Sequence, residues 1–106
     1  MSRFAEVVER LAAVIESRRG GDPSQSWSAR LLADPALAAK KLGEEAIETV
    51  LAAAQGDKAA LAAESADLVY HWLVLLAASD VSLDDVAAVL ETREGTSGIA
   101  EKSSRA

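Results

Sequence analysis

The residues of this chain that could do chemistry are carboxylates in two clusters. They are Glu44, Glu45 and Glu48, followed by Glu64 and Asp67. The chain has no cysteine and a single histidine, which excludes a thiolate or paired-histidine zinc site. Hard divalent cations such as Mg²⁺ prefer oxygen ligands and keep positions for water and substrate phosphates. The clusters therefore predict Mg²⁺ bound against a polyphosphate.

Both clusters fall in segments with helical periodicity. At 100° per residue, the three glutamates lie within an arc of about 100° beside an apolar face. Glu64, Asp67 and His71 share a stripe of about 60° on a helix that is otherwise apolar nearly all round. Carboxylates gathered between two such helices repel one another unless protons or cations intervene, so a hard cation is expected there.

Each candidate also has a simpler interpretation. Taken alone, the three glutamates are best explained as a solvated helix face, because charged helix faces are common. Glu64 and Asp67 are followed by the uncharged run 68–78, which favours a functional role for them. A lone histidine on an apolar helix is more often a hydrogen-bonded core residue, so we place His71 beside the metal ligands rather than among them.

Basic residues near the clusters are candidates for phosphate contacts. They are Arg30, Lys40, Lys41, Arg93 and Lys102. Surface charges or helical pairs such as Lys40 with Glu44 and Lys41 with Glu45 explain them equally well. For Trp27 and Trp72, core packing is favoured over stacking on a base.

Four main helices are expected to position these residues, over 2–19, 34–55, 58–79 and 82–94. Asp34-Pro35 and the Ser82–Asp85 capping box mark helix starts, whereas Gly20-Gly21-Asp22-Pro23 and Gly56 mark breaks. The segment 24–33 is expected to be a loop or brief helix anchored by Trp27, Leu31 and Leu32. The chain is thus predicted to be one all-α domain, 1–106: an antiparallel bundle of four helices, its core completed by homodimerisation.

Composition limits the partners. The formal charge of −6 argues against nucleic-acid polymers. The longest uncharged run, 68–79, is about half the length of a membrane span, and the start of the chain has no apolar signal core. A cytoplasmic protein is expected. By composition, the Gly- and Ser-rich tail from residue 95 predicts a frayed terminus.

Two pairs, Glu45-x-x-Glu48 and Glu64-x-x-Asp67, resemble the metal-binding motif of the all-α nucleoside triphosphate pyrophosphohydrolases. Four longer segments narrow the resemblance. They are SWSARLL at 26–32, KKLGEEAIE at 40–48, ESADLVYH at 64–71 and REGTSGIAEK at 93–102. Together they resemble the phosphoribosyl-ATP pyrophosphohydrolase family over essentially the whole chain.

This resemblance implies a homodimeric cytoplasmic enzyme of histidine biosynthesis that hydrolyses phosphoribosyl-ATP to phosphoribosyl-AMP and pyrophosphate with Mg²⁺. It implies metal ligands at Glu45, Glu48, Glu64 and Asp67. Glu44 or Glu48 is then the candidate for activating water. It also gives the tail a role, because substrate contacts are implied for Arg93, Ser97, Gly98 and Lys102, besides Arg30, Lys40 and Lys41.

The departures from the family are small. Ser28 and Arg30 stand where Thr and Lys are more usual, which changes the geometry of a phosphate contact and keeps its charge. Three other functions compete with this one: a housekeeping hydrolase of free nucleoside triphosphates, a di-iron bundle and a non-catalytic dimerisation module. The tail argues against the first, and the lack of Glu-x-x-His pairs argues against the second.

Overall fold

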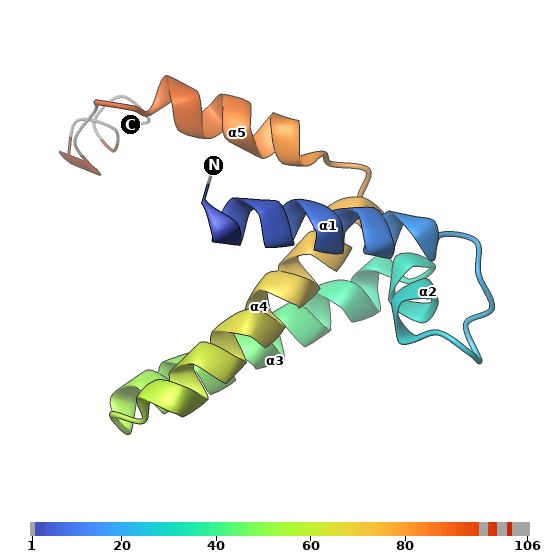
Figure 1. The fold of residues 1–106 in the computed structure, drawn as a ribbon, viewed down its shortest axis with the longest axis horizontal. Helices are drawn as coiled ribbons and strands as arrows, with labels where there is room; N and C mark the ends of the chain where they lie inside the picture. The colour runs from blue at the N-terminus through green and yellow to red at the C-terminus, as the bar shows by residue number, and fades with distance from the viewer. Residues whose placement is uncertain (1, 96–97, 100–101, 103–106) are drawn as a thin grey trace.

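The chain folds into helices throughout the part that the computed structural model describes, residues 2–95, 98–99 and 102. They are α1 (Arg3–Ser17), α2 (Trp27–Leu32), α3 (Pro35–Ala54), α4 (Lys58–Ala78) and α5 (Leu83–Thr92) (Figure 1). The described ranges contain no strand, so the all-α prediction is confirmed.

Capping residues set the helix starts where the sequence predicts them. The Asp34 carboxylate accepts from the Leu37 backbone N–H at 3.1 Å, and proline occupies the first turn of α3. Ser82 and Asp85 form both halves of a capping box at α5. The four long helices match their predicted ranges to within one or two residues. The undecided segment 24–33 contains the short helix α2.

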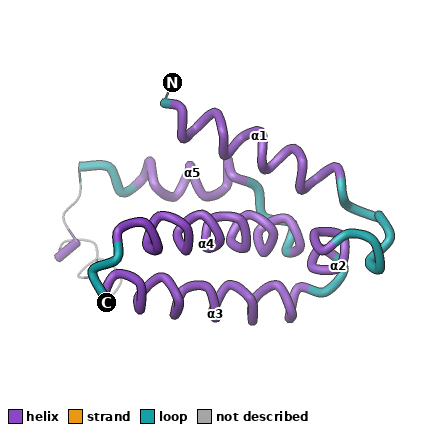
Figure 2. Tube along the Cα trace, turned by 60° about the horizontal axis from the view of Figure 1, so that its bottom comes forward, coloured by secondary structure: helices purple, strands orange, loops and turns teal. Residues whose placement is uncertain are grey.

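Helices α3 and α4 form an antiparallel hairpin that carries both carboxylate clusters (Figure 2). Gly56 turns the chain between them with φ of +70°, a conformation that side chains other than glycine rarely adopt. Buried or half-buried positions recur along both helices at alternating spacings of four and three, as in a coiled-coil seam. They are Ala38, Leu42, Glu45, Thr49 and Ala52 on α3, and Leu61, Glu64, Leu68, His71 and Leu75 on α4.

The apolar core lies at one end of this hairpin, where α1 and α2 pack on α4. Its most completely buried side chains are Ile15, Leu31 and Val74. Leu31 and Leu32 anchor α2 as predicted, but Trp27 does not, because 43% of it is exposed. The expectation of core packing was therefore wrong for Trp27. It is confirmed for Trp72, which packs against the core.

Helix α5 runs apart from the α3–α4 hairpin (Figure 1). None of its residues is buried, and Leu83 at its start packs against the core. One chain therefore does not close a four-helix core by itself. Closure by a second copy stays a prediction.

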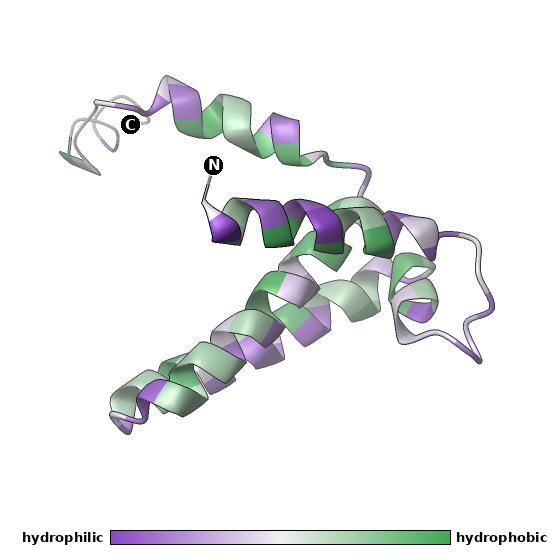
Figure 3. Cartoon of the chain, in the orientation of Figure 1, coloured by the Kyte–Doolittle hydropathy of each residue, from purple (hydrophilic) through white to green (hydrophobic). Residues whose placement is uncertain are grey.

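Helix α4 is the one helix, among the described residues, that is long and apolar enough to cross a membrane by length and composition alone. The apolar colouring in Figure 3 runs along most of it. It carries Glu64 and Asp67 near its middle and packs against α1, α2 and α3. We therefore interpret it as the central helix of the fold, as its all-round apolar pattern predicts.

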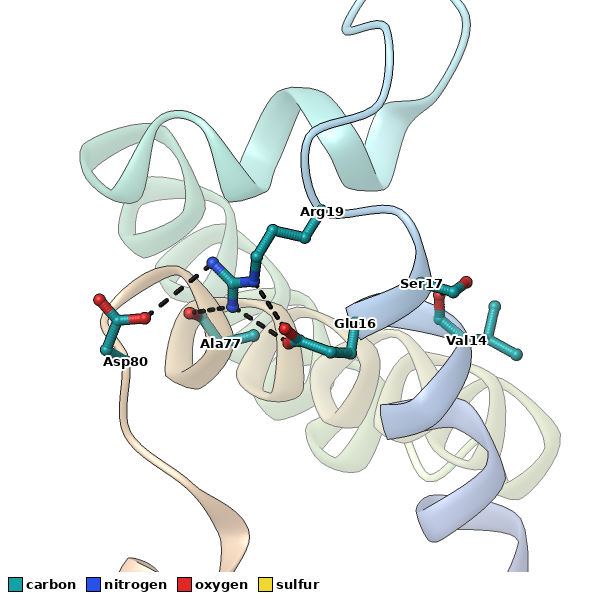
Figure 4. Close-up of polar contacts among 6 residues, drawn as sticks. All are labelled: Val14, Glu16, Ser17, Arg19, Ala77 and Asp80. Atoms are coloured by element: carbon teal, nitrogen blue, oxygen red, sulfur yellow. Dashed lines mark hydrogen bonds and ion pairs between the residues drawn. The ribbon is translucent and has the colours of Figure 1, made fainter.

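Arg19 ties the end of α1 to the end of α4 (Figure 4). Its guanidinium pairs with Glu16 at 2.7 Å and donates to the Ala77 carbonyl at 2.8 Å, with Asp80 at 4.0 Å. This carbonyl lies in the last turn of α4, where backbone acceptors lack partners within the helix and a cation is favourable. The hydrogen bond with Glu16 also raises the pKa of Arg19 and lowers that of Glu16.

We predict that Arg19→Met lowers the free energy of unfolding by about 1 kcal/mol, the usual net value of an intramolecular hydrogen bond. Arg18→Met is the matched control, because Arg18 is exposed and makes no such contact across helices. Urea unfolding followed by circular dichroism measures both. Equal losses in the two variants would contradict the role of Arg19.

Candidate functional site

Three of the four predicted metal ligands meet between α3 and α4. One carboxylate oxygen from each of Glu45, Glu48 and Glu64 lies within 4.8 Å of the other two. Glu45 and Glu48 are on one helix three residues apart, and Glu64 comes from the facing helix. Glu48 is exposed, whereas the other two are half-buried. The cluster therefore has a buried side and a side open to solvent.

The buried side of the cluster contains two carboxylate oxygens that no described residue satisfies. Glu45 Oε2 and Glu64 Oε2 are both buried without a partner among the described residues. Both residues occupy seam positions, where a helical hairpin ordinarily places apolar side chains. Two acceptors left without donors in such a place indicate a site that suits a cation or a proton.

The electrostatics of the cluster favour the neutral form of two carboxyls. Burial raises the pKa of Glu45 and of Glu64, and the neighbouring Glu48 carboxyl raises both further, by hydrogen bonding and by charge repulsion. Asp67 adds repulsion to both. His71 acts in the opposite direction on Glu45, so the ring is close enough to stabilise that carboxylate. A bound cation would relieve this mutual repulsion.

Asp67 and His71 adjoin the cluster. The Asp67 side chain is exposed and lies outside the group of three oxygens, although its charge acts on two of them. His71 is buried, with Nδ1 2.8 Å from the Asp67 carbonyl oxygen and its ring edge-on to Tyr70. With its proton on Nδ1, the ring donates to that carbonyl. This arrangement agrees with the predicted place of His71 beside the ligands.

Glu44 lies outside the group of three carboxylate oxygens. Its carboxylate is exposed and pairs with Lys41 Nζ at 3.2 Å. This pair spans three residues instead of the four considered in the sequence for Lys41 with Glu45. The helix places Glu45 in the seam and Glu44, one residue earlier, on its exposed face.

The two cations at the ring of Trp27 are a feature that was not predicted from the sequence. Arg30 Cζ lies 5.7 Å and Lys41 Nζ 5.8 Å from the centre of its half-exposed ring. Lys41 precedes Glu45 by one helical turn, so two cations and an aromatic ring adjoin the carboxylates. The spacing of Trp27 and Arg30 on one helix was the available signal.

The remaining predicted substrate residues that the structure describes lie at exposed positions. Lys40 is exposed on α3, and Arg93 follows the last turn of α5. Gly98 and Lys102 are exposed, and Ser97 lies outside the described residues.

An apolar hollow of about 370 Å³ opens beside the cluster. Its lining comes from both helices of the hairpin: Leu42, Ala46, Leu68, Val69 and Trp72. The site therefore combines acidic groups, nearby cations and an apolar surface.

The raised pKa values predict how stability depends on pH without divalent cations. Below about pH 4.5, the ordinary value, Glu64 is protonated in the folded and unfolded states alike. As pH rises through the higher folded-state pKa, the folded protein loses the stability that this neutral carboxyl gives. Glu64→Gln should therefore become increasingly stabilising as pH rises, in urea unfolding with a chelator present. A difference between variant and wild type that does not change with pH would contradict this.

Comparisons with known proteins identify the family of this chain. The family profile described as Phosphoribosyl-ATP pyrophosphohydrolase matches residues 8–94. A Caulobacter sp. (strain K31) protein named Phosphoribosyl-ATP pyrophosphatase is 70% identical over 105 residues, covering 99% of this chain and 98% of that protein. Proteins of the same name from Caulobacter vibrioides (strain NA1000 / CB15N) and Cereibacter sphaeroides (strain ATCC 17029 / ATH 2.4.9) are 71% and 60% identical, covering 98% and 93% of this chain and 97% of each relative. This chain therefore belongs to the phosphoribosyl-ATP pyrophosphohydrolase family.

Proposed function

We propose that this protein hydrolyses phosphoribosyl-ATP to phosphoribosyl-AMP and pyrophosphate, a step of histidine biosynthesis, with Mg²⁺ as cofactor. The observation that carries the proposal is the meeting of Glu45, Glu48 and Glu64, with two buried carboxylate oxygens that have no partner in the described part of the chain. Membership of the family and the names of close relatives supply the substrate.

The residues present fit a hard cation. All donors are carboxylate oxygens, as Mg²⁺ prefers, and two of them need a partner. Glu45, Glu48 and Glu64 would hold the ion, with Asp67 one turn further along α4. When bound, Mg²⁺ would neutralise polyphosphate charge and stabilise the leaving pyrophosphate.

Individual side chains have separate roles in the hydrolysis. Water attacks phosphorus, the anhydride bond between the α and β phosphates breaks, and pyrophosphate leaves. We assign Glu48 as the group that orients the water and accepts its proton, because its carboxylate is the solvent-exposed member of the cluster. Glu44, the other candidate, is held by Lys41. Arg30 and Lys41 are placed to contact phosphate oxygens.

We also propose a cytoplasmic homodimer. Ile47, Val50 and Leu51 of α3 are large apolar side chains left exposed beside the site. An exposed apolar patch of this kind is typical of a protein interface. The absence of cysteine fits a reducing compartment.

We predict that Glu64→Gln lowers kcat/KM for phosphoribosyl-ATP by more than about 100-fold, beyond the range typical of groups that only support a ligand. The reason is the loss of a charged oxygen from the cation site. Pyrophosphate release with and without Mg²⁺ measures it. Glu91→Gln, an exposed position on α5, is the matched control.

Full activity of folded Glu64→Gln would overturn the site. The same assay with ATP and other nucleoside triphosphates as competitors tests the substrate. Equal release from free triphosphates would assign a housekeeping activity instead. Release from none would support a non-catalytic module.

We predict that the wild-type protein sediments at twice the chain mass of 11.1 kDa. Val50→Glu should shift it toward the monomer, because a charge in an apolar interface is costly. Ala59→Glu places the same charge on an exposed position of α4 and should leave the dimer intact. Sedimentation of wild-type protein as a monomer would refute the homodimer.

A further inference from the structure

We propose that Thr49 is a positioning residue: its hydroxyl fixes Glu45 against Glu64 and thereby sets the affinity of the site for its divalent cation. The inference deepens the proposed function and rests on it. Thr49 is outside the carboxylate cluster and touches neither substrate nor ion in this account.

The geometry of the Thr49 hydroxyl is the main evidence. Oγ1 lies 2.8 Å from the Glu45 carbonyl oxygen on its own helix and 3.2 Å from the Glu64 carbonyl oxygen across the seam. The hydroxyl has one proton, which these two acceptors share. The two carbonyls belong to the same residues whose Oε2 atoms are buried without partners. One side chain thus links the backbones that carry both buried ligands.

The seam around Thr49 offers little else that fixes register. Its neighbours along α3 and α4 include Ala52, Leu61 and Leu68, whose apolar side chains offer no hydrogen bond across the seam. A polar group at a seam position specifies register, because a shift would leave it without its partner. The cross-helix bond of Thr49 to Glu64 is of this kind.

Repulsion within the cluster makes such a link useful. Glu45 and Glu64 face the charges of Glu48 and Asp67, which act to drive α3 and α4 apart. The Thr49 bond opposes this separation at the level of the carboxylates. A site kept at its ligand spacing before the ion arrives binds that ion more tightly.

Thr92 shows what an ordinary helical threonine does. Its Oγ1 donates to the Val89 carbonyl at 2.7 Å within α5, a common bond inside one helix. Thr49 makes the equivalent bond and a second one across the seam. Thr92 is therefore the matched control position.

The test is a titration of the full-length protein with Mn²⁺, a paramagnetic stand-in for Mg²⁺, followed by electron paramagnetic resonance. Thr49→Val removes the hydroxyl and keeps the shape, so it should weaken Mn²⁺ binding by about 10-fold, as expected for a residue that orients metal ligands. Thr49→Ser keeps the hydroxyl and should bind close to wild type. Thr92→Val should leave the affinity unchanged.

Activity gives a second reading. In Thr49→Val, added Mg²⁺ should restore most of the lost kcat, because the defect lies in affinity and not in the reacting groups. Circular dichroism confirms that each variant is folded. If Thr49→Val does not fold, Thr49→Ala removes the same hydroxyl with a residue that favours helix, and the same loss of affinity is expected.

The outcomes separate the two proposals. A folded Thr49→Val or Thr49→Ala that binds Mn²⁺ as tightly as wild type overturns the role of Thr49 alone. A wild-type protein that binds no Mn²⁺ overturns the proposed function and this inference with it.

Discussion

The burial of Glu45 and Glu64 in the seam between α3 and α4 is the constraint on which the rest of the structure depends. A hairpin of two helices is most stable when its seam is apolar, and here two carboxylates occupy it with an oxygen each that has no partner. Glu48 and Asp67 add repulsion. Such a seam is stable when a proton or a cation balances the charge. The fold therefore favours binding of a cation, which the proposed reaction also needs.

The elements around the hairpin allow this costly seam to persist. The apolar core of Ile15, Leu31 and Val74 lies where α1 and α2 pack against α4, and Arg19 links the ends of α1 and α4. Stability is thus concentrated at one end of the hairpin, and the acidic site lies further along it. Of the two cations beside the Trp27 ring, Lys41 lies on α3 one helical turn before Glu45, and Arg30 lies on α2. A polyphosphate bound to a cation at the carboxylates would then have positive charge on two sides, from that cation and from Arg30 and Lys41.

Local signals made much of this structure predictable from the sequence. Asp34-Pro35 and the Ser82–Asp85 capping box gave helix starts, because each acts through bonds within one turn. The spacing of the acidic residues gave the cluster of three, because helical geometry places them on known faces.

Features that depend on contact between helices were not predictable in this way. The cross-helix bond of Thr49 needs the register of α3 against α4, and the exposure of Trp27 follows from how α2 docks. The sequence also allowed several lysine–glutamate pairs, and only the structure shows that Glu44 pairs with Lys41.

The most direct test of the central claim is thermal unfolding of the wild-type protein with a chelator and with added Mg²⁺. A ligand that binds only the folded state raises the apparent stability in proportion to the logarithm of its concentration. The account predicts an unfolding midpoint that rises steadily as Mg²⁺ is added, because the ion relieves the repulsion between Glu45, Glu48 and Glu64. A midpoint unchanged across the whole range of Mg²⁺ would contradict it and leave the carboxylates as an acidic patch without a metal.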